Sequence, residues 1–213
     1  MSDAPFAHDV SDPERAVLGD GLHCDDALGF RWQGQDDVPM ATVMARINAR
    51  NEAVLRSLAM LEEHDESAAD DVERAEFHRL EGKVNLVLEL LSELVRQQHP
   101  GPPQIAMRFS AEGVCWHAPS AHREGELLLT EWYLLPAWPV ALTLYARVAH
   151  SRRAPGGHLV CARIEGASDS TRDWLEKLVF RRHRRAIAQQ RVTRREDPTA
   201  SGIVAGDPPP ETK

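Results

Sequence analysis

The chain has 213 residues, of which 42% are apolar and 27% charged, enough for one domain with an appendage or for two small domains. Its formal net charge of −8 argues against general nucleic-acid binding, because that affinity comes mainly from neutralising phosphates. No run of about 18 apolar residues occurs, and the N-terminus is acidic where a secretory signal would be basic, so we expect a cytoplasmic protein without a membrane span.

The charge is unevenly distributed. Residues 1–100 contain 9 Lys and Arg against 21 Asp and Glu, whereas residues 101–213 contain 16 against 12. An acidic half followed by a basic half indicates two modules.

Three cysteines occur, at Cys24, Cys115 and Cys161, with no CxxC spacing. An odd number without metal-like spacing suggests neither a disulfide framework nor a zinc ribbon. We expect reduced thiols and assign no metal site.

The N-terminal segment is rich in Asp, Ala and Gly, and we expect residues 1–26 to be disordered. The apolar stretch from Leu28 to Trp32 then predicts one short strand. Because no other strand candidate is near in sequence, its partner must come from far along the chain.

Helical periodicity begins at Met44. Apolar residues recur at alternating spacings of three and four, interrupted only by Asn51: Met44, Ile47, Val54, Leu58 and Leu61. Residues 64–71 break this stripe. Ser67 with Asp70 three residues later fits the N-terminal cap of a second helix, and one continuous helix with a phase slip is the alternative.

A second apolar stripe has no polar interruption. It consists of six consecutive a and d positions of a heptad pattern: Phe77, Leu80, Val84, Val87, Leu91 and Leu94. Leu88, Leu90 and Val95 widen the face at e and g positions, where a two-stranded coiled coil normally carries charges. The width favours three or four packed helices, and we predict that the six residues mediate oligomerisation.

The helices at 44–62 and 69–98 could instead pack on each other as a hairpin within one chain. Two helices leave much of so wide a stripe exposed, and a large exposed apolar patch usually marks an interface. We therefore expect packing between chains in addition to the hairpin.

After His99 to Pro103, whose prolines end the helix, the apolar period changes to two. A hairpin about residues 110–113 is predicted first, followed by strands at 126–134, 140–149 and 158–164. In the strand at 140–149, every second residue from Val140 to Val148 is apolar, which is typical of a strand with one buried face. Such a meander predicts a small barrel or sandwich.

A terminal helix begins at Ser168 or Ser170 and carries an arginine cluster, Arg181 to Arg185, near its end. Positive charge at a helix C-terminus is electrostatically favourable. The tail that follows contains several prolines, and we expect residues 192–213 to be disordered.

The order of elements from Leu28 to Arg191 resembles a PilZ domain. The similarity rests on the turn Arg108-Phe-Ser-Ala-Glu-Gly113, the loop Leu135-Pro-Ala-Trp-Pro139, the strand with Tyr145-Ala-Arg147, a Gly-Gly turn, and the closing helix from Asp173 to Arg185. The preceding heptad helices resemble those of the atypical tetrameric PilZ subgroup.

This resemblance implies an α+β fold, with a six-stranded antiparallel β-barrel, a C-terminal helix, and two long helices inserted after the first strand. It places the domain at 27–191. Within it, the helical oligomerisation insertion spans 40–98, the main barrel strands 104–165 and the C-terminal helix 169–191.

PilZ receptors commonly bind the bacterial second messenger cyclic di-GMP through an RxxxR pair before the barrel and a [D/N]xSxxG turn. Ser110 and Gly113 match the end of the turn, and Arg108 stands where an acidic or amide residue is expected. A guanidinium group has only donors, so it cannot accept from a guanine edge as those residues can. Arg46 to Arg50 and Arg181 to Arg185 have the RxxxR spacing at other locations. Arg108, Ser110 and Gly113 are the candidate ligand-binding residues.

Two functional hypotheses follow. The first is a non-enzymatic bacterial signalling adaptor, a homo-oligomer that the resemblance implies to be a tetramer, acting through an unidentified regulatory protein in motility, type IV pilus or virulence regulation. No cofactor or catalytic residue is assigned, because the chain has no GxSxG, HExxH or phosphate-binding glycine loop. The alternative is a genuine cyclic di-GMP receptor with a rearranged site using Arg108, Ser110 and basic residues of another element or subunit.

Overall fold

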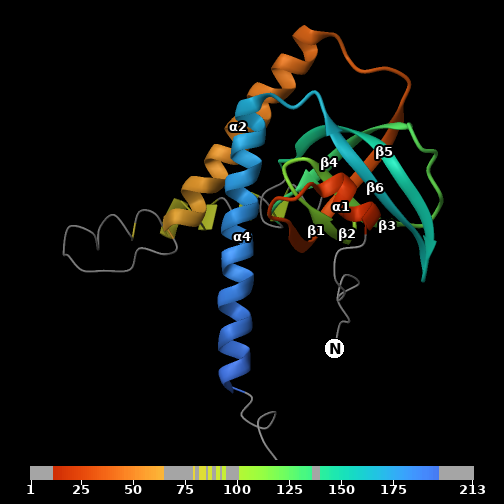
Figure 1. Ribbon diagram of the computed structural model, residues 1–213. Coiled ribbons are helices and arrows are strands. Elements are labelled where there is room, and N and C mark those ends of the chain that lie inside the picture. Colours follow the sequence, from red (N-terminus) through yellow and green to blue (C-terminus); the bar gives the residue numbers. More distant parts are fainter. Residues whose placement is uncertain are drawn as a thin grey trace, which may run out of the picture.

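The computed structural model describes residues 12–64, 101–135 and 140–196, together with positions 79, 82–84, 86–87, 90–91 and 93–94. Three helices and six strands are labelled in Figure 1. The helices are α1 (Asp12–Leu18), α2 (Ala41–His64) and α4 (Asp169–Glu196). The strands are β1 (Cys24–Gln35), β2 (Gln104–Phe109), β3 (Gly113–Ala118), β4 (Leu127–Tyr133), β5 (Leu142–Ala154) and β6 (Gly157–Glu165).

The six strands close into an antiparallel barrel in the order β1-β2-β3-β6-β5-β4. Strand β1 pairs with β2 on one side, where Asp25 is opposite Arg108, and with β4 on the other, where Trp32 is opposite Thr130. Two long helices lie beside the barrel, and α4 extends away from it (Figure 1). The predicted α+β fold with a six-stranded barrel and a C-terminal helix is thereby confirmed.

Alternating apolar residues fill the barrel, as β5 illustrates. Leu142, Leu144, Ala146 and Val148 are buried, in agreement with the predicted inward face. The largest buried side chains are aromatic: Phe30, Phe109, Trp116 and Trp132. The rings of Phe109 and Trp132 meet edge to face with centroids 5.3 Å apart, a favoured aromatic geometry. The indole N–H of Trp132 donates to the hydroxyl of Thr130, so this polar group is satisfied inside the core.

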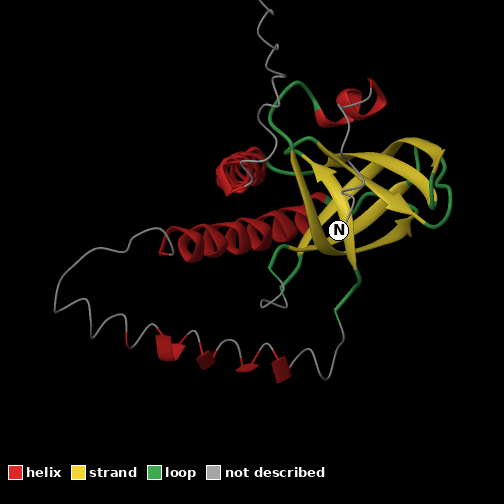
Figure 2. Ribbon diagram, turned by 90° about the horizontal axis from the view of Figure 1, so that it is seen from below, coloured by secondary structure: helices red, strands yellow, loops and turns green. Residues whose placement is uncertain are grey.

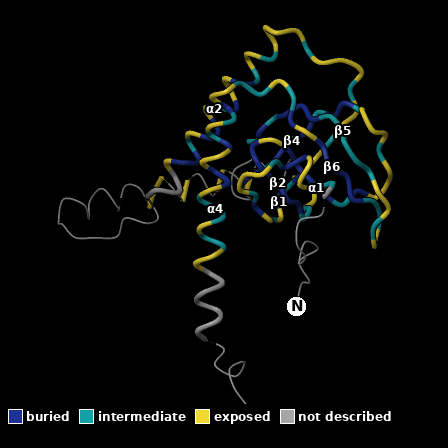
Figure 3. Tube along the Cα trace, viewed as in Figure 1, coloured by how far each residue is buried: buried dark blue, intermediate teal, exposed yellow. Residues whose placement is uncertain are grey.

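Two asparagines fasten α2 to its own domain. The Asn51 side-chain amide donates to the carbonyl oxygen of Thr143 at 2.6 Å and accepts from the Thr143 N–H at 3.0 Å. Asn48 donates to the Gly166 carbonyl at 2.8 Å. Asn51, which interrupts the first apolar stripe, is therefore hydrogen-bonded to the start of β5. Leu55 and Leu58 of α2 are buried in the same core cluster as barrel residues and Leu175 of α4. Buried parts of α2 lie beside α4 in Figure 3.

Residues 12–26 are ordered, contrary to our expectation of a disordered segment. Asp12 and Pro13 begin α1 with residue types favoured at a helix start, and Gly19, with a φ of 74°, ends it. Strand β1 then begins at Cys24, four residues before the predicted strand. Because the sequence has no turn signal between Cys24 and Leu28, the strand also includes Asp25 and Asp26.

The C-terminal helix also exceeds its predicted end at residue 191. Helix α4 continues to Glu196, so residues 192–196 of the expected disordered tail are helical. The first residue that cannot continue the helix is Pro198.

Cys115 and Cys161 form a disulfide, and the expectation of reduced thiols is wrong for these two residues. They are directly opposite in the β3–β6 register. Helix α1 covers them from outside the barrel, where they pack with Val17, Leu18 and Leu159. Cys24 is free and buried, and burial raises the pKa of its thiol to about 12.

The described positions between 79 and 94 are helical, and their apolar side chains face solvent in the single chain. The exposed fractions of Val84, Val87, Leu91 and Leu94 lie between 49% and 53%. In Figure 2 these helical pieces lie apart from the barrel. Phe77 and Leu80 lie outside the described residues. No helix within the described part of the chain has the length and apolar character needed to cross a membrane.

Candidate functional site

The β2–β3 turn brings together the three residues singled out as ligand candidates. The hydroxyl oxygen of Ser110 accepts from the backbone N–H groups of Glu112 at 3.0 Å and Gly113 at 3.2 Å. The Ser110 N–H in turn donates to the Gly113 carbonyl at 2.9 Å. Ser110 is buried, and its side chain thus stabilises the turn from within.

Gly113 is required by the close approach of α1. A Cβ at this position would lie 2.6 Å from Cγ1 of Val17 and 2.9 Å from the carbonyl oxygen of Ala162. Both distances are shorter than ordinary carbon contacts. The glycine therefore has a packing role at the junction of α1, β3 and β6.

Arg108 lies inside an ion-pair cluster. Its guanidinium forms a bidentate pair with Asp25, with Nε 2.6 Å from Oδ1 and Nη2 2.9 Å from Oδ2. Its Nη1 lies 3.5 Å from Oε1 of Glu14 on α1. Arg108 and Glu14 are 3% and 4% exposed. Such fork-to-fork pairing is the strong form of an arginine–carboxylate contact, and here it joins α1, β1 and β2.

The charged cluster also affects His23, which precedes β1. Burial, and secondarily the positive charge of Arg108, lowers the pKa of His23 below its ordinary value of 6.5. Asp25 and Glu14 partly oppose this shift.

Sequence reasoning missed Glu14 and Asp25 because both lie in the segment assigned to disorder. Two signals were present. The Asp12-Pro13 start and the Gly19 stop mark a short helix, and a buried arginine in a strand requires acidic partners.

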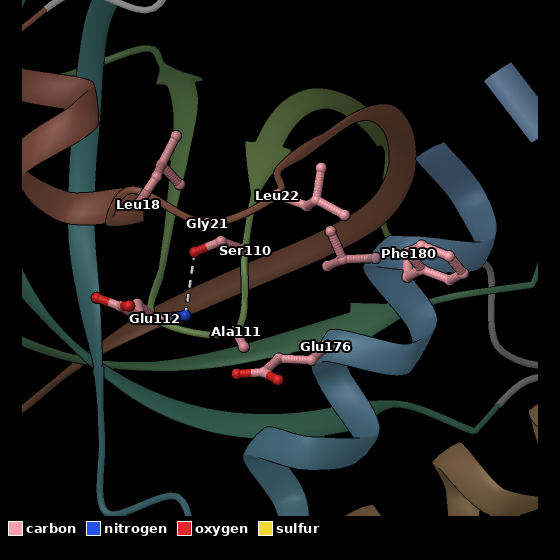
Figure 4. Close-up of a pocket in the computed structure, with 9 residues that line it drawn as sticks. Leu18, Gly21, Leu22, Ser110, Ala111, Glu112, Glu176 and Phe180 are labelled. Carbon is pink, nitrogen blue, oxygen red and sulfur yellow. Dashed lines mark hydrogen bonds between the residues drawn. The ribbon is translucent and has the colours of Figure 1, made fainter. Parts of the chain in front are cut away.

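A pocket of about 320 Å³ opens beside the turn, between the α1–β1 segment and α4. Figure 4 shows side chains from the α1–β1 segment, the turn and α4 converging on it. Its lining residues are Leu18, Gly21, Leu22, Ser110, Ala111, Glu112, Glu176, Val179 and Phe180. The ionisable groups in this lining are the carboxylates of Glu112 and Glu176, so the local charge is unfavourable for phosphate.

The two RxxxR candidates do not reach this pocket. Arg46 and Arg50 are exposed on α2. The other pair is Arg181 and Arg185 on α4, and between them Arg182 pairs with Asp26 and donates to the carbonyl oxygen of Leu134 at 2.7 Å. The pocket lining includes none of Arg46, Arg50, Arg181 and Arg185.

A family model described as "Atypical PilZ domain, cyclic di-GMP receptor" matches residues 55–192. The chain belongs to the atypical PilZ domain family. The resemblance drawn from the order of turns, strands and closing helix is confirmed. The described strands β2–β6, residues 55–64 of α2 and most of α4 fall within the matched range of this PilZ family.

A solved PilZ structure has a similar fold. It is a pathogenic protein from Xanthomonas campestris, described as a new tetrameric PilZ domain self-assembled via an unusual helical bundle. The two chains are 26% identical and superpose with a TM-score of 0.66, over 83% of this chain and 95% of the other. No curated protein matches the sequence significantly.

Proposed function

We propose that this protein is a non-enzymatic signalling adaptor that assembles through the helix containing residues 77–94 and acts through protein contacts. The observation that carries the proposal is the environment of Arg108, which stands at the first position of the turn motif, where an acidic or amide residue is expected. Its guanidinium is buried and held by two carboxylates, that of the buried Glu14 and that of the partly exposed Asp25, so binding a nucleotide would require breaking these ion pairs. A guanine or phosphate at this turn would have to compensate that loss.

The remaining elements of the turn support the same reading. The Ser110 hydroxyl is occupied by backbone N–H groups, and Gly113 is covered by Val17 of α1. The adjacent pocket presents Glu112 and Glu176, which would repel the phosphates of cyclic di-GMP. The signal that this protein transmits is therefore expected to depend on protein contacts rather than on the usual nucleotide site.

The alternative function is a cyclic di-GMP receptor with a rearranged site. The family description favours it, because the matched model is named for a cyclic di-GMP receptor. In that case the ligand would use basic residues from another element or subunit.

Isothermal calorimetry with cyclic di-GMP separates the two functions. We expect no binding heat up to about 1 mM ligand, which corresponds to a binding free energy weaker than about −4 kcal/mol. Micromolar or tighter binding that Ser110→Ala abolishes would establish the receptor function instead. Ser110→Ala is preferred to Arg108→Ala as the diagnostic variant, because Arg108→Ala also removes the ion pairs with Glu14 and Asp25 that join α1, β1 and β2.

The assembly proposal rests on the exposed apolar positions of the second heptad helix. Val84, Val87, Leu91 and Leu94 are each about half exposed in the single chain. Burying the remaining half of such a side chain contributes roughly 1 kcal/mol. Because each chain of an oligomer would bury several of these side chains, the contributions add to a substantial stabilisation of the assembly. The Xanthomonas protein assembles via a helical bundle, and we propose a homotetramer here by similarity.

The regulated process and the compartment are proposed by analogy with the family. We propose a cytoplasmic bacterial protein whose partner belongs to motility, type IV pilus or virulence regulation. The acidic overall charge gives no basis for a nucleic-acid partner.

A further inference from the structure

A groove with acidic edges and an apolar floor runs from the β2–β3 turn along α4. It consists of the pocket beside the turn and a second hollow lined by Asp173, Glu176, Lys177 and Phe180, and the two share Glu176 and Phe180. Asp173, Glu176 and Phe180 are spaced by three and four residues on α4, so they lie on one face of the helix. We call this surface the acidic groove.

The apolar part of the acidic groove is large enough for one bulky side chain. Leu22 is 46% exposed and Phe180 is 49% exposed, whereas Ala111 and Val179 are buried in the wall between them. Figure 4 shows Leu22 and Phe180 on neighbouring segments at one side of the turn. Two large apolar side chains exposed together beside a concavity are typical of a contact surface.

The charged part of the groove is acidic. Glu112, Asp173 and Glu176 are exposed, and no ion pair to another described residue is formed by any of them. Lys177 also lines the second hollow, but its ammonium lies over the Trp174 ring at 4.5 Å from the centroid.

Helix-dipole stabilisation accounts for carboxylates in the first turn of α4, yet Glu176 lies beyond that turn and Glu112 lies on another element. Arg184 lies one turn further along α4, with its guanidinium 5.8 Å from the Phe180 ring centroid, and it lines neither hollow. The groove therefore offers negative charge at one end and apolar surface at the other.

We propose that the acidic groove binds a segment of a partner protein that carries a large apolar side chain next to arginine or lysine. The apolar side chain would lie between Leu22 and Phe180, and the cation would pair with Glu176 and Asp173, which line the second hollow together. This inference rests on the proposed adaptor function and names the chemistry of its partner. A free anion or nucleotide is disfavoured by the same carboxylates. The heptad helix already provides the surface for a second copy, which leaves the groove for a different protein.

The test uses the full-length protein and a fluorescein-labelled ten-residue peptide with a central leucine between two arginines. Fluorescence anisotropy should report a dissociation constant of about 100 µM or tighter. Replacing the peptide leucine by alanine, or its arginines by glutamates, should weaken binding at least about tenfold, because each change removes one of the two contacts. Added salt should weaken binding as well.

Glu176→Lys should weaken peptide binding at least about tenfold, whereas Asp36→Lys should change it less than about twofold. Asp36 is exposed at the opposite end of β1, so this control matches the change in net charge away from the groove. Phe180→Ala tests the apolar contact independently. Equal binding to wild type and Glu176→Lys, or no binding at about 1 mM protein, would overturn the proposal.

Light scattering on Glu176→Lys without peptide completes the test. An unchanged mass is expected, and a loss of mass would mean that a second copy occupies the groove, which overturns the proposal. Failure of the peptide assay with unchanged assembly and no response to cyclic di-GMP would reject the groove alone. Failure of the adaptor function would appear separately, as nucleotide binding in the calorimeter.

Discussion

Individual residues around the β2–β3 turn have structural roles that account for a partly preserved ligand motif. Ser110 stabilises the turn, Gly113 admits α1, and Arg108 joins three elements through Asp25 and Glu14. A motif can therefore retain its spacing because the fold needs the same residues. The side chains at the turn contact other groups of the protein itself. Membership of the PilZ family therefore does not by itself imply that this turn binds a ligand.

Gly113→Ala should destabilise the fold by about 1–3 kcal/mol, since the added methyl group meets Val17 and the Ala162 carbonyl oxygen in a packed junction. Urea unfolding measures the change. Gly101→Ala is the matched control, because a Cβ at Gly101 meets nothing within 4 Å. Equal midpoints for the two variants would show that α1 does not pack closely on the turn in solution.

His23 should make the stability of the fold depend on pH. Its pKa in the folded state is lowered by burial and by Arg108, so the unfolded chain takes up a proton first as the pH falls. The stabilisation is complete above the unfolded pKa of about 6.5 and is lost as the pH decreases through the folded value. The free energy of unfolding should therefore fall more steeply between about pH 7.5 and pH 5.5 in the wild type than in His23→Gln. Parallel slopes in urea titrations would contradict this.

At the scale of elements, two helices with similar apolar stripes differ in what these stripes contact. Helix α2 uses its stripe and two asparagines against β5 and α4 of its own chain, whereas the described apolar residues of the next helix remain exposed. The single polar interruption at Asn51 distinguishes the two. A buried amide bonded to backbone fixes α2 to one strand, while an uninterrupted stripe is suited to another helix.

The Cys115–Cys161 disulfide between β3 and β6 predicts a particular labelling pattern. Iodoacetamide added in denaturant without reductant should modify one of the three cysteines, namely Cys24, because the other two form a disulfide. After reduction all three should react. Mass spectrometry counts the adducts, and three adducts in the unreduced sample would show that the pair is reduced in the purified protein.

Much of this fold could be predicted from local patterns, and the exceptions have physical causes. The strands from 104 to 165 follow from alternating apolar residues, since a barrel buries one face of each strand. The disulfide depends on the β3–β6 register, which single-strand patterns do not specify. The role of Asn51 depends on a β-strand distant in sequence, and the acidic groove requires the turn and α4 to be placed together.

At the scale of the whole molecule, assembly should depend on the a and d positions of the second heptad helix. Leu91→Asp places a charge in the proposed bundle, and light scattering should then give the monomer mass of 23.8 kDa. Leu86→Asp is the control, because Leu86 is 55% exposed but lies outside the a/d stripe. A monomeric wild type, or equal effects of the two substitutions, would argue against the bundle.

The pairing of β1 with β2 has a consequence for folding kinetics and for the evolution of the chain. These neighbouring strands are separated in sequence by residues 36–103, which contain the helical insertion, so the barrel closes only after a long loop has been formed. Loop-closure entropy grows slowly, by about 0.6 kcal/mol for each doubling of length. Lengthening or shortening the insertion beyond α2 should therefore alter the equilibrium stability of the barrel little, and the heptad helix can diverge between relatives while the barrel persists. Refolding of the barrel, by contrast, should be limited by this distant strand pairing, since contacts far apart in sequence form slowly.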